Sequence, residues 1–223
     1  MIEFNLYNLF TEQHMCGRFE SKPSIQSLVK DFKKHNQNLK VELNSSSKEI
    51  SEKQEYKEHK SINIAPTNKI QSISYAVNNY NLFLTHWGIK FSSNSPLIFN
   101  SRIETIKEKK YWTTLFDRNR LLVPMSAFYE WKKEGTRKIP YRIFLPDQVI
   151  FYIPAVYHID IEKNIFTSLI TTTPNEFIKQ IHHRMPVILR IKEGINYLID
   201  DADTNLGKCI SYTGKMEMER VSL

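Results

Sequence analysis

RLLVPMSAFYEW, residues 120–131, consists mostly of apolar and aromatic side chains and carries one carboxylate, Glu130, near its end. A run of this composition is typical of a buried β-strand. Six further short β-rich runs lie on both sides of it, at residues 61–67, 70–77, 80–89, 140–145, 149–159 and 166–173. The sequence therefore predicts a single α+β domain dominated by short antiparallel strands.

Helical patterns are fewer. A first helix is expected after Ser24, because Ile25, Leu28, Val29 and Phe32 follow at helical spacing. Residues 100–116 and 175–181 are also predicted to be helical. Residues 35–60 contain many charges and few apolar side chains, which indicates a polar loop inserted into the domain.

Composition limits the possible functions. A chain of 223 residues fits one domain with a core of its own. Two cysteines are too few for a secreted disulfide framework, so we expect a cytoplasmic protein. No apolar run reaches the roughly 20 residues of a membrane-spanning helix. The formal charge of +7 permits an acidic partner such as nucleic acid.

A thiol near the start of the chain offers the most distinctive chemistry. Cys16 lies in MCGRF, residues 15–19, and residues 1–14 form an N-terminal extension that could be a strand, a tail or the result of start-codon choice. If Cys16 is the first residue of the mature protein, its α-amine and thiol form a 1,2-aminothiol, which condenses with aldehydes to a thiazolidine. The alternative is a buried cysteine that acts as a small apolar residue.

Two other segments carry candidate proton carriers. Glu130 in AFYEW is either on the solvent face of its strand or a partly desolvated carboxylate with a raised pKa, suited to proton transfer. In IHHRMP, the adjacent imidazoles of His182 and His183 and the guanidinium of Arg184 precede a proline. These three polar side chains cannot all face a core, so we expect at least one to be exposed or paired.

Further polar and aromatic residues have two interpretations each. Asn100 and Arg102, with Glu104 following, would form a helix N-cap and a surface ion pair, or would contact a sugar-phosphate backbone. Trp87 beside Gly88 is a core residue or stacks on an unpaired base. Neither a metal-ligand spacing, nor a phosphate-binding glycine loop, nor a GxSxG motif is present, and no metal or cofactor is expected.

Taken together, seven motifs resemble the SOS response-associated peptidase (SRAP) family, the abasic site processing proteins. They are MCGRF (15–19), NIAPT (63–67), HWGI (86–89), NSRIET (100–105), LVPMSAFYEW (122–131), PYRIF (140–144) and IHHRMPVIL (181–189). They follow the order of the family and extend from about residue 15 to residue 209. The expected domain is residues 15–223, with residues 1–14 as an extension that is possibly absent from the mature protein.

The resemblance implies a fold and a reaction. The fold would be a single α+β domain with a curved, barrel-like antiparallel β core flanked by helices and a basic groove for single-stranded DNA. The N-terminal cysteine would attack the open-chain aldehyde of an abasic site and shield the site as a covalent DNA–protein crosslink. By position, Cys16, Glu130 and His182 would be catalytic. The DNA-binding residues would be Arg18, Asn100, Arg102, Arg184 and Trp87.

Two departures from the family pattern bear on this expectation. His183 stands where the family suggests an acidic residue, so its charge should lower the pKa of His182. Residues 1–14 precede Cys16, so its α-amine must be released by a start at Met15 with removal of the initiator methionine or by self-cleavage. If the extension remains, Cys16 forms only a reversible thiohemiacetal.

Two other functions remain open at this stage. A thiol peptidase or autopeptidase would use Cys16, His182 and Glu130 on peptide bonds. A non-covalent single-stranded-DNA-binding module would need no reactive thiol. In each case we expect a monomer without a membrane partner, and the DNA-directed functions place it at the nucleoid.

Overall fold

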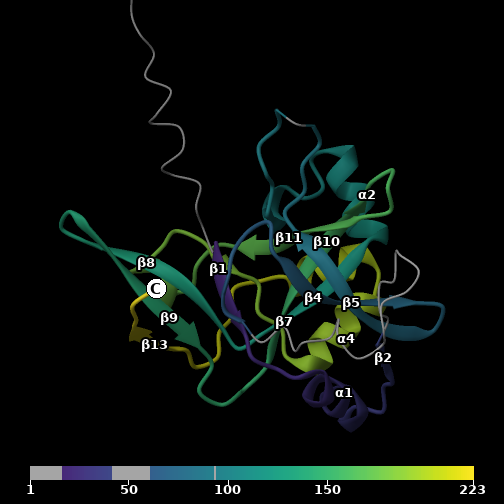
Figure 1. Cartoon of the computed structure of the whole chain (residues 1–223), viewed down its shortest axis with the longest axis horizontal. Coiled ribbons are helices and arrows are strands. Elements are labelled where there is room, and N and C mark those ends of the chain that lie inside the picture. Colours follow the sequence, from purple (N-terminus) through teal and green to yellow (C-terminus); the bar gives the residue numbers. More distant parts are fainter. Residues whose placement is uncertain (1–16, 42–60, 93) are drawn as a thin grey trace, which may run out of the picture.

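The computed structural model describes residues 17–41, 61–92 and 94–223 (Figure 1). Cys16, the predicted extension at residues 1–14 and most of the predicted polar loop lie outside the described residues. Within that loop region, residues 39–41 form a short strand, and Leu39 is buried.

The described residues form a mixed α+β domain with thirteen strands and five α-helices. The strands are β1 (Arg18–Ser21), β2 (Leu39–Val41), β3 (Ser61–Ile64), β4 (Lys69–Ala76), β5 (Asn79–Trp87), β6 (Asn100–Arg102), β7 (Arg120–Met125), β8 (Ala127–Glu134), β9 (Arg137–Phe144), β10 (Phe151–Ile159), β11 (Ile165–Thr172), β12 (Met185–Pro186) and β13 (Glu217–Arg220). The helices are α1 (Ile25–Lys34), α2 (Lys110–Arg118), α3 (Glu176–Lys179), α4 (Ile191–Ile199) and α5 (Ala202–Lys208), with a 3-10 turn, η2, at Ile103–Thr105.

Two sheets make up the β core. The smaller sheet has the order β13-β9-β8-β1-β3, and all of its neighbouring strands are antiparallel. The larger sheet has the order β12-β11-β10-β7-β4-β5-β2, with β6 beside β11. A parallel pairing of β11 with β5 closes five of its strands into a ring. The prediction of a curved, mainly antiparallel core flanked by helices is confirmed.

The larger sheet is buried on both faces, and its central strands show why. In β7, Leu121 and Val123 pack into a core shared with Phe19 and Phe128 of the smaller sheet. Leu122, on the opposite face, packs into a second core with side chains of α1, α2 and α4. Strands covered on both faces are apolar at successive positions, which explains the unbroken apolar runs of β7 and β10.

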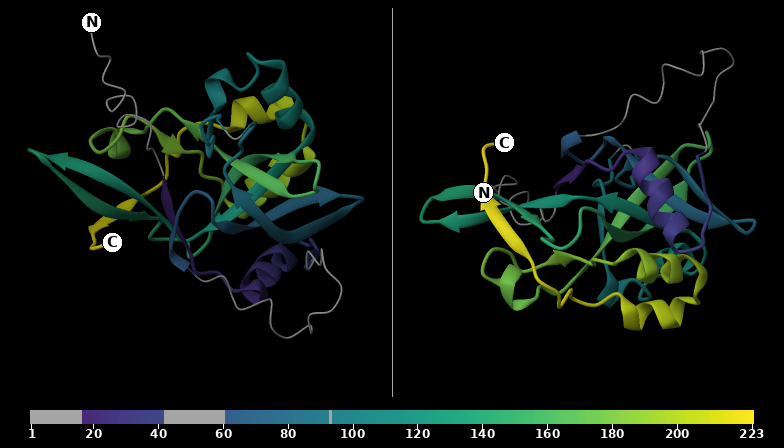
Figure 2. Two further views of the ribbon diagram at one scale, coloured as in Figure 1. Left: turned by 45° about the horizontal axis from the view of Figure 1, so that its top comes forward. Right: turned by 90° about the horizontal axis from the view of Figure 1, so that it is seen from below.

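Helices α1 and α4 pack into the same core against the larger sheet. The β8–β9 hairpin projects from the body of the molecule (Figure 2). The first helix was predicted, and its start follows from Ser24, whose hydroxyl accepts a hydrogen bond from the Ser27 amide at 3.1 Å. Leu28 and Phe32 on its inner face are fully buried. Burial of each contributes about 1.5–3 kcal/mol. Among the described residues, no helix has the length and apolarity to span a membrane.

Two sequence predictions need correction. Residues 100–116 were expected to be helical, but Asn100–Arg102 form β6, because they pair with β11 in parallel and Ser101 shares a 2.7 Å hydrogen bond with Ser168. The apolar run at residues 120–131 is two strands rather than one. At Ser126 the chain passes from the larger sheet to the smaller, and the Ser126 hydroxyl accepts a hydrogen bond from the Lys22 amide at 2.8 Å.

Candidate functional site

The start of β1 lies against β8, which places Glu130 near the first described residue. Arg18 is opposite Tyr129, the residue that precedes Glu130 in β8. Glu130 is only 1% exposed, so the alternative that it lies on the solvent face is wrong. On its other side, Glu130 is opposite Tyr141 of β9. A carboxylate is thus held inside the smaller sheet, one position along β8 from the residue opposite Arg18.

Arg18 is held at its position by a neighbouring strand. One terminal nitrogen of its guanidinium donates to Oδ1 of Asn63 in β3 at 2.6 Å, near the surface. This contact leaves other N–H groups of the guanidinium for a ligand, since arginine carries five donors. Asn63 is a site residue that sequence reasoning did not single out, although it begins the NIAPT motif.

The two histidines of IHHRMP stack on each other in the segment between α3 and β12. Their ring centroids are 4.3 Å apart at an interplanar angle of 29°. Nδ1 of His182 accepts a hydrogen bond from the Arg184 amide at 3.2 Å. Burial, the charge of His183 and, to a smaller extent, the charge of Lys138 lower the pKa of His182 to about 4. The expected downward shift caused by His183 is confirmed, although burial is the larger cause.

This arrangement fixes the protonation state of His182. With a pKa of about 4, its imidazole is almost entirely neutral near pH 7. Because Nδ1 accepts the Arg184 amide hydrogen, the single ring proton is assigned to Nε2. His182 therefore presents a neutral N–H donor, rather than an imidazole that exchanges a proton near pH 6.5.

Arg184 is buried and paired. Its two terminal nitrogens each lie 2.7 Å from an oxygen of Glu104, and one also donates to the Thr171 carbonyl at 2.9 Å. Its guanidinium is therefore largely committed to protein groups rather than open to a phosphate. Glu104 forms an ion pair with Arg184, not the expected surface pair with Arg102. Burial raises the pKa of Glu104, but the bonds from Arg184 outweigh this effect and hold it below its ordinary value.

Asn100 and Arg102 lie in β6, next to the end of β11. Arg102 is opposite Thr171, and its side chain is exposed. Asn100 is half-buried and belongs to a strand, so the helix N-cap alternative is wrong. Since β12 pairs with β11 at the same end, β6 and the segment that carries Arg184 lie on either side of one strand.

Trp87 is a core residue, which was one of its two interpretations. Its side chain is 0% exposed, and Nε1 donates to the Phe99 carbonyl at 2.9 Å. Its ring contacts Phe19 edge-on at 5.1 Å and Phe99 at 5.8 Å. Stacking on a base is not possible in this arrangement. Instead, Trp87 connects Phe19, next to Arg18, with the strand that begins at Asn100.

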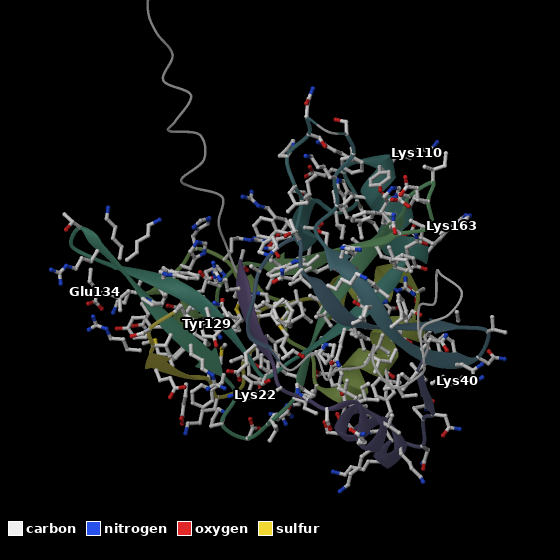
Figure 3. The ribbon with its side chains drawn as sticks, in the orientation of Figure 1. Lys22, Lys40, Lys110, Tyr129, Glu134 and Lys163 are labelled. Atoms are coloured by element: carbon white, nitrogen blue, oxygen red, sulfur yellow. The ribbon has the colours of Figure 1, made fainter. Side chains whose placement is uncertain are left out.

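The remaining features lie away from these residues. A hollow of about 320 Å³ lies between β2, β4 and β5 and is lined by none of the candidate residues. Within the described ranges, no group of three His, Cys, Asp or Glu side chains is arranged to hold a metal. Cys209 is buried, and burial raises the pKa of its thiol to about 12. Figure 3 shows Tyr129 at the base of the β8–β9 hairpin and Glu134 toward its tip.

Fold and site together define a single-domain α+β protein in which a buried carboxylate, a neutral imidazole and exposed arginines are positioned by two sheets. A family model described as SOS response associated peptidase (SRAP) matches residues 15–223. The chain belongs to this family, as its sequence motifs predicted.

Similar proteins include abasic site processing proteins of Bacillus subtilis (strain 168). YoaM is 32% identical over 189 residues, covering 78% of this chain and 75% of YoaM. YoqW is 31% identical over 202 residues, covering 85% and 84%. A crystal structure of a Bacteroides thetaiotaomicron protein superposes with a TM-score of 0.72 at 22% identity, covering 93% and 92% of the two chains. This last likeness concerns the fold.

Proposed function

We propose that the protein recognises abasic sites in single-stranded DNA and forms a thiazolidine crosslink through Cys16 as the first residue of the mature chain. The printed names of YoaM and YoqW, abasic site processing proteins, support the substrate. The net charge of +7 supports a polyanionic partner.

The placement of Glu130 beside the start of β1 is the observation that carries the proposal. Arg18 is paired with Tyr129, and continuing this register by one residue would set Gly17 opposite Glu130. A peptide bond joins Cys16 to Gly17, so their Cα atoms are about 3.8 Å apart. An aminothiol at this point would have a buried carboxylate within reach. Burial disfavours the charged form of a carboxylate, so a raised pKa of Glu130 stays our prediction.

The proposed reaction consumes one aldehyde and one aminothiol and releases one water. The neutral α-amine of Cys16 adds to C1′ of the open-chain sugar to give a carbinolamine, and loss of hydroxide as water gives an imine. Glu130 in its acid form would donate the proton that leaves with this water, and its carboxylate would then take the N–H proton of the iminium to leave the imine. The Cys16 sulfur then adds to the imine carbon, its proton passes to the nitrogen, and the thiazolidine ring closes.

His182 would act before the covalent step. The sugar must open to its aldehyde form, which requires a donor to its ring oxygen and an acceptor for the hydroxyl proton. The Nε2–H of neutral His182 is suited to donate a hydrogen bond to that oxygen. Of the arginines, Arg18 and Arg102 have guanidinium groups near the surface and would contact phosphates, while Asn100 would contact the sugar.

The release of Cys16 determines whether the ring can form. A start at Met15 with removal of that methionine, or self-cleavage of the Met15–Cys16 bond, would expose the α-amine. A Cys16→Ala protein made from Met1 distinguishes the two, because self-cleavage by the thiol predicts that it keeps residues 1–15. Loss of those residues would exclude the thiol as the cleaving group.

An oligonucleotide with one abasic site tests the function. Protein beginning at Cys16 should form an adduct that survives SDS and heat, and Cys16→Ser should not, because a hydroxyl is a far poorer nucleophile than a thiol. A Glu130→Gln variant should form the adduct more slowly. If the wild-type protein binds the oligonucleotide without forming the adduct, the protein is a non-covalent binding module and the proposal is wrong.

A further inference from the structure

The hairpin formed by β8 and β9 has two lysines directly opposite each other. Lys133 is paired with Lys138 in the antiparallel register, and both side chains are exposed. Like charges at facing positions of two strands are destabilising. Gly135 and Thr136 form the tight connection, in which Gly135 has φ of +63°, so the hairpin register is set by the turn.

No carboxylate among the described residues compensates this pair. The projecting part of the hairpin, residues 131–140, has four cations, Lys132, Lys133, Arg137 and Lys138, and none forms an ion pair with a described acidic residue. The one acidic residue of this part, Glu134, instead accepts a hydrogen bond from the Tyr141 hydroxyl at 3.1 Å. The hairpin therefore carries surplus positive charge that an external anion would neutralise.

The lysine pair lies on the same face of the smaller sheet as Arg18. Side chains alternate along a strand, so Lys133 shares its face with Trp131 and Tyr129, and Arg18 is opposite Tyr129. Lys133 lies four positions after Tyr129, which is about 13 Å of strand. That length matches about four nucleotides at the rise of a stacked strand.

The hairpin also approaches the segment of the paired histidines. The charge of Lys138 contributes to lowering the pKa of His182, so its ammonium group lies within electrostatic range of that imidazole. His183, stacked on His182, is the other titratable group with a resolved influence there. Lys138 thus connects the hairpin electrostatically with the segment that carries His182.

We propose that Lys133 and Lys138 bind the phosphodiester backbone of the DNA strand a few nucleotides beyond the abasic site, so that the projecting hairpin (Figure 1) extends the binding surface. This inference rests on the proposed function for its partner. A phosphate bound by each lysine replaces their mutual repulsion with two attractions. The repulsion between the two lysines therefore destabilises the hairpin in the free protein, and phosphate binding removes this destabilisation.

Salt dependence of binding to an intact single-stranded oligonucleotide tests the contact without any chemistry. Each phosphate contact adds about 0.7 to the slope of log affinity against log salt. Lys133→Gln/Lys138→Gln should therefore reduce the slope by about 1.4. Between 50 and 200 mM salt, its affinity should fall about sevenfold less than that of the wild type. Lys30→Gln/Lys34→Gln, on exposed positions of α1, removes the same charge elsewhere and should leave the slope unchanged.

A second variant separates binding from folding. Lys133→Glu places opposite charges face to face with Lys138, so it should raise the melting temperature while weakening DNA binding more than Lys133→Gln does. An unchanged salt slope in the double variant, or an equal change in the α1 control, overturns the inference. If the wild type forms no adduct but the slope changes as expected, the crosslinking proposal fails and the hairpin contact stands.

Discussion

The guanidinium of Arg184 meets the carboxylate of Glu104 side by side, with both nitrogen–oxygen distances at 2.7 Å. Arg184 is 8% exposed and Glu104 38% exposed. Glu104 also accepts a hydrogen bond from the Thr173 amide at 3.0 Å. The pair therefore ties the segment that carries His182 to the turn after β6 and to the end of β11.

Loss of this pair should destabilise the protein. Glu104→Gln leaves a buried guanidinium without its counter-charge, and we expect it to lower the free energy of unfolding by about 2 kcal/mol. Chemical denaturation at pH 7 measures the change. Glu176→Gln is the matched control, because its ion pair with Lys179 is exposed and should contribute less than about 0.5 kcal/mol. Equal losses in the two variants would contradict a structural role for the Glu104–Arg184 pair.

The same pair predicts a pH dependence. The folded-state pKa of Glu104 lies below its ordinary value of 4.5, so its contribution is present above pH 4.5 and is lost as the pH falls through the folded pKa. The difference in unfolding free energy between wild type and Glu104→Gln should therefore shrink on acidification. A difference that stays constant from pH 7 down to pH 3 would show that the charge of Glu104 is not responsible.

His183 should control the protonation of His182. In the wild type, the imidazole of His182 should titrate near pH 4 in an NMR titration. His183→Gln removes the second-largest cause of the lowered pKa, so the pKa should rise but stay below 6.5, because burial remains. His158→Gln, which alters a histidine packed against Tyr111, should leave it unchanged. No shift in His183→Gln would mean that the charge of His183 does not contribute to the lowered pKa.

The contribution of His182 to stability changes with pH in the opposite direction to that of a salt-bridged histidine. Because the folded pKa of His182 is below 6.5, the unfolded chain binds the proton more readily. The contribution of His182 is therefore full above pH 6.5 and is lost as the pH falls toward 4. His182→Gln should flatten this part of the stability profile, and a steeper profile in the variant would contradict the assignment.

Arg142 should be necessary for folding stability. It donates to both oxygens of Glu20, at 2.7 and 3.1 Å, and Glu20 is 2% exposed. Arg142→Met leaves the buried Glu20 carboxylate with only Lys22, at 3.1 Å, as a counter-charge and should cost about 3 kcal/mol. The double variant Glu20→Gln/Arg142→Met should recover part of that loss, whereas Arg220→Met, on the exposed end of β13, should cost little. No recovery in the double variant would assign the effect to packing of Arg142 instead.

Cys209 should be inert in the native protein. It is 1% exposed, and at a pKa of about 12 it holds roughly one thiolate in ten thousand at pH 8. Alkylation of the folded protein should therefore label a single thiol, Cys16. The Cys16→Ala variant should react only after unfolding. Labelling of Cys209 in the native Cys16→Ala protein would contradict the buried environment found for this thiol.

Local signals in the sequence predicted the elements that depend on them. Ser24, Leu28 and Phe32 specify α1 through its cap and its buried face, and Asn175 caps α3 in the same way. In contrast, Asn100–Arg102 resemble a helix start locally but form a strand because β11 supplies their partner. A pairing between residues about 70 positions apart leaves no mark on local periodicity.

The sequence patterns did not predict helix α4, because it contains a glycine that its packing against β7 requires. Gly194 lies in its middle, where glycine weakens the helical signal by about 1 kcal/mol relative to alanine. A Cβ at this position would come within 2.9 Å of the Leu122 side chain, so glycine permits the helix to approach β7. Sequence patterns were limited in the same way at the candidate site, because they do not specify contacts between distant residues. The motifs included Arg184 and Trp87, but they did not predict the ion pair of Arg184 with Glu104 and did not decide between the two interpretations of Trp87.

The mass of the DNA adduct tests the central claim most directly. Protein that begins at Cys16 is incubated with single-stranded DNA containing one abasic site, and the product is measured intact before and after treatment with borohydride. A thiazolidine predicts the summed masses minus one water, unchanged by the reductant. An adduct that retains the water, one that gains two hydrogens on reduction, or no adduct at all would contradict ring closure by Cys16.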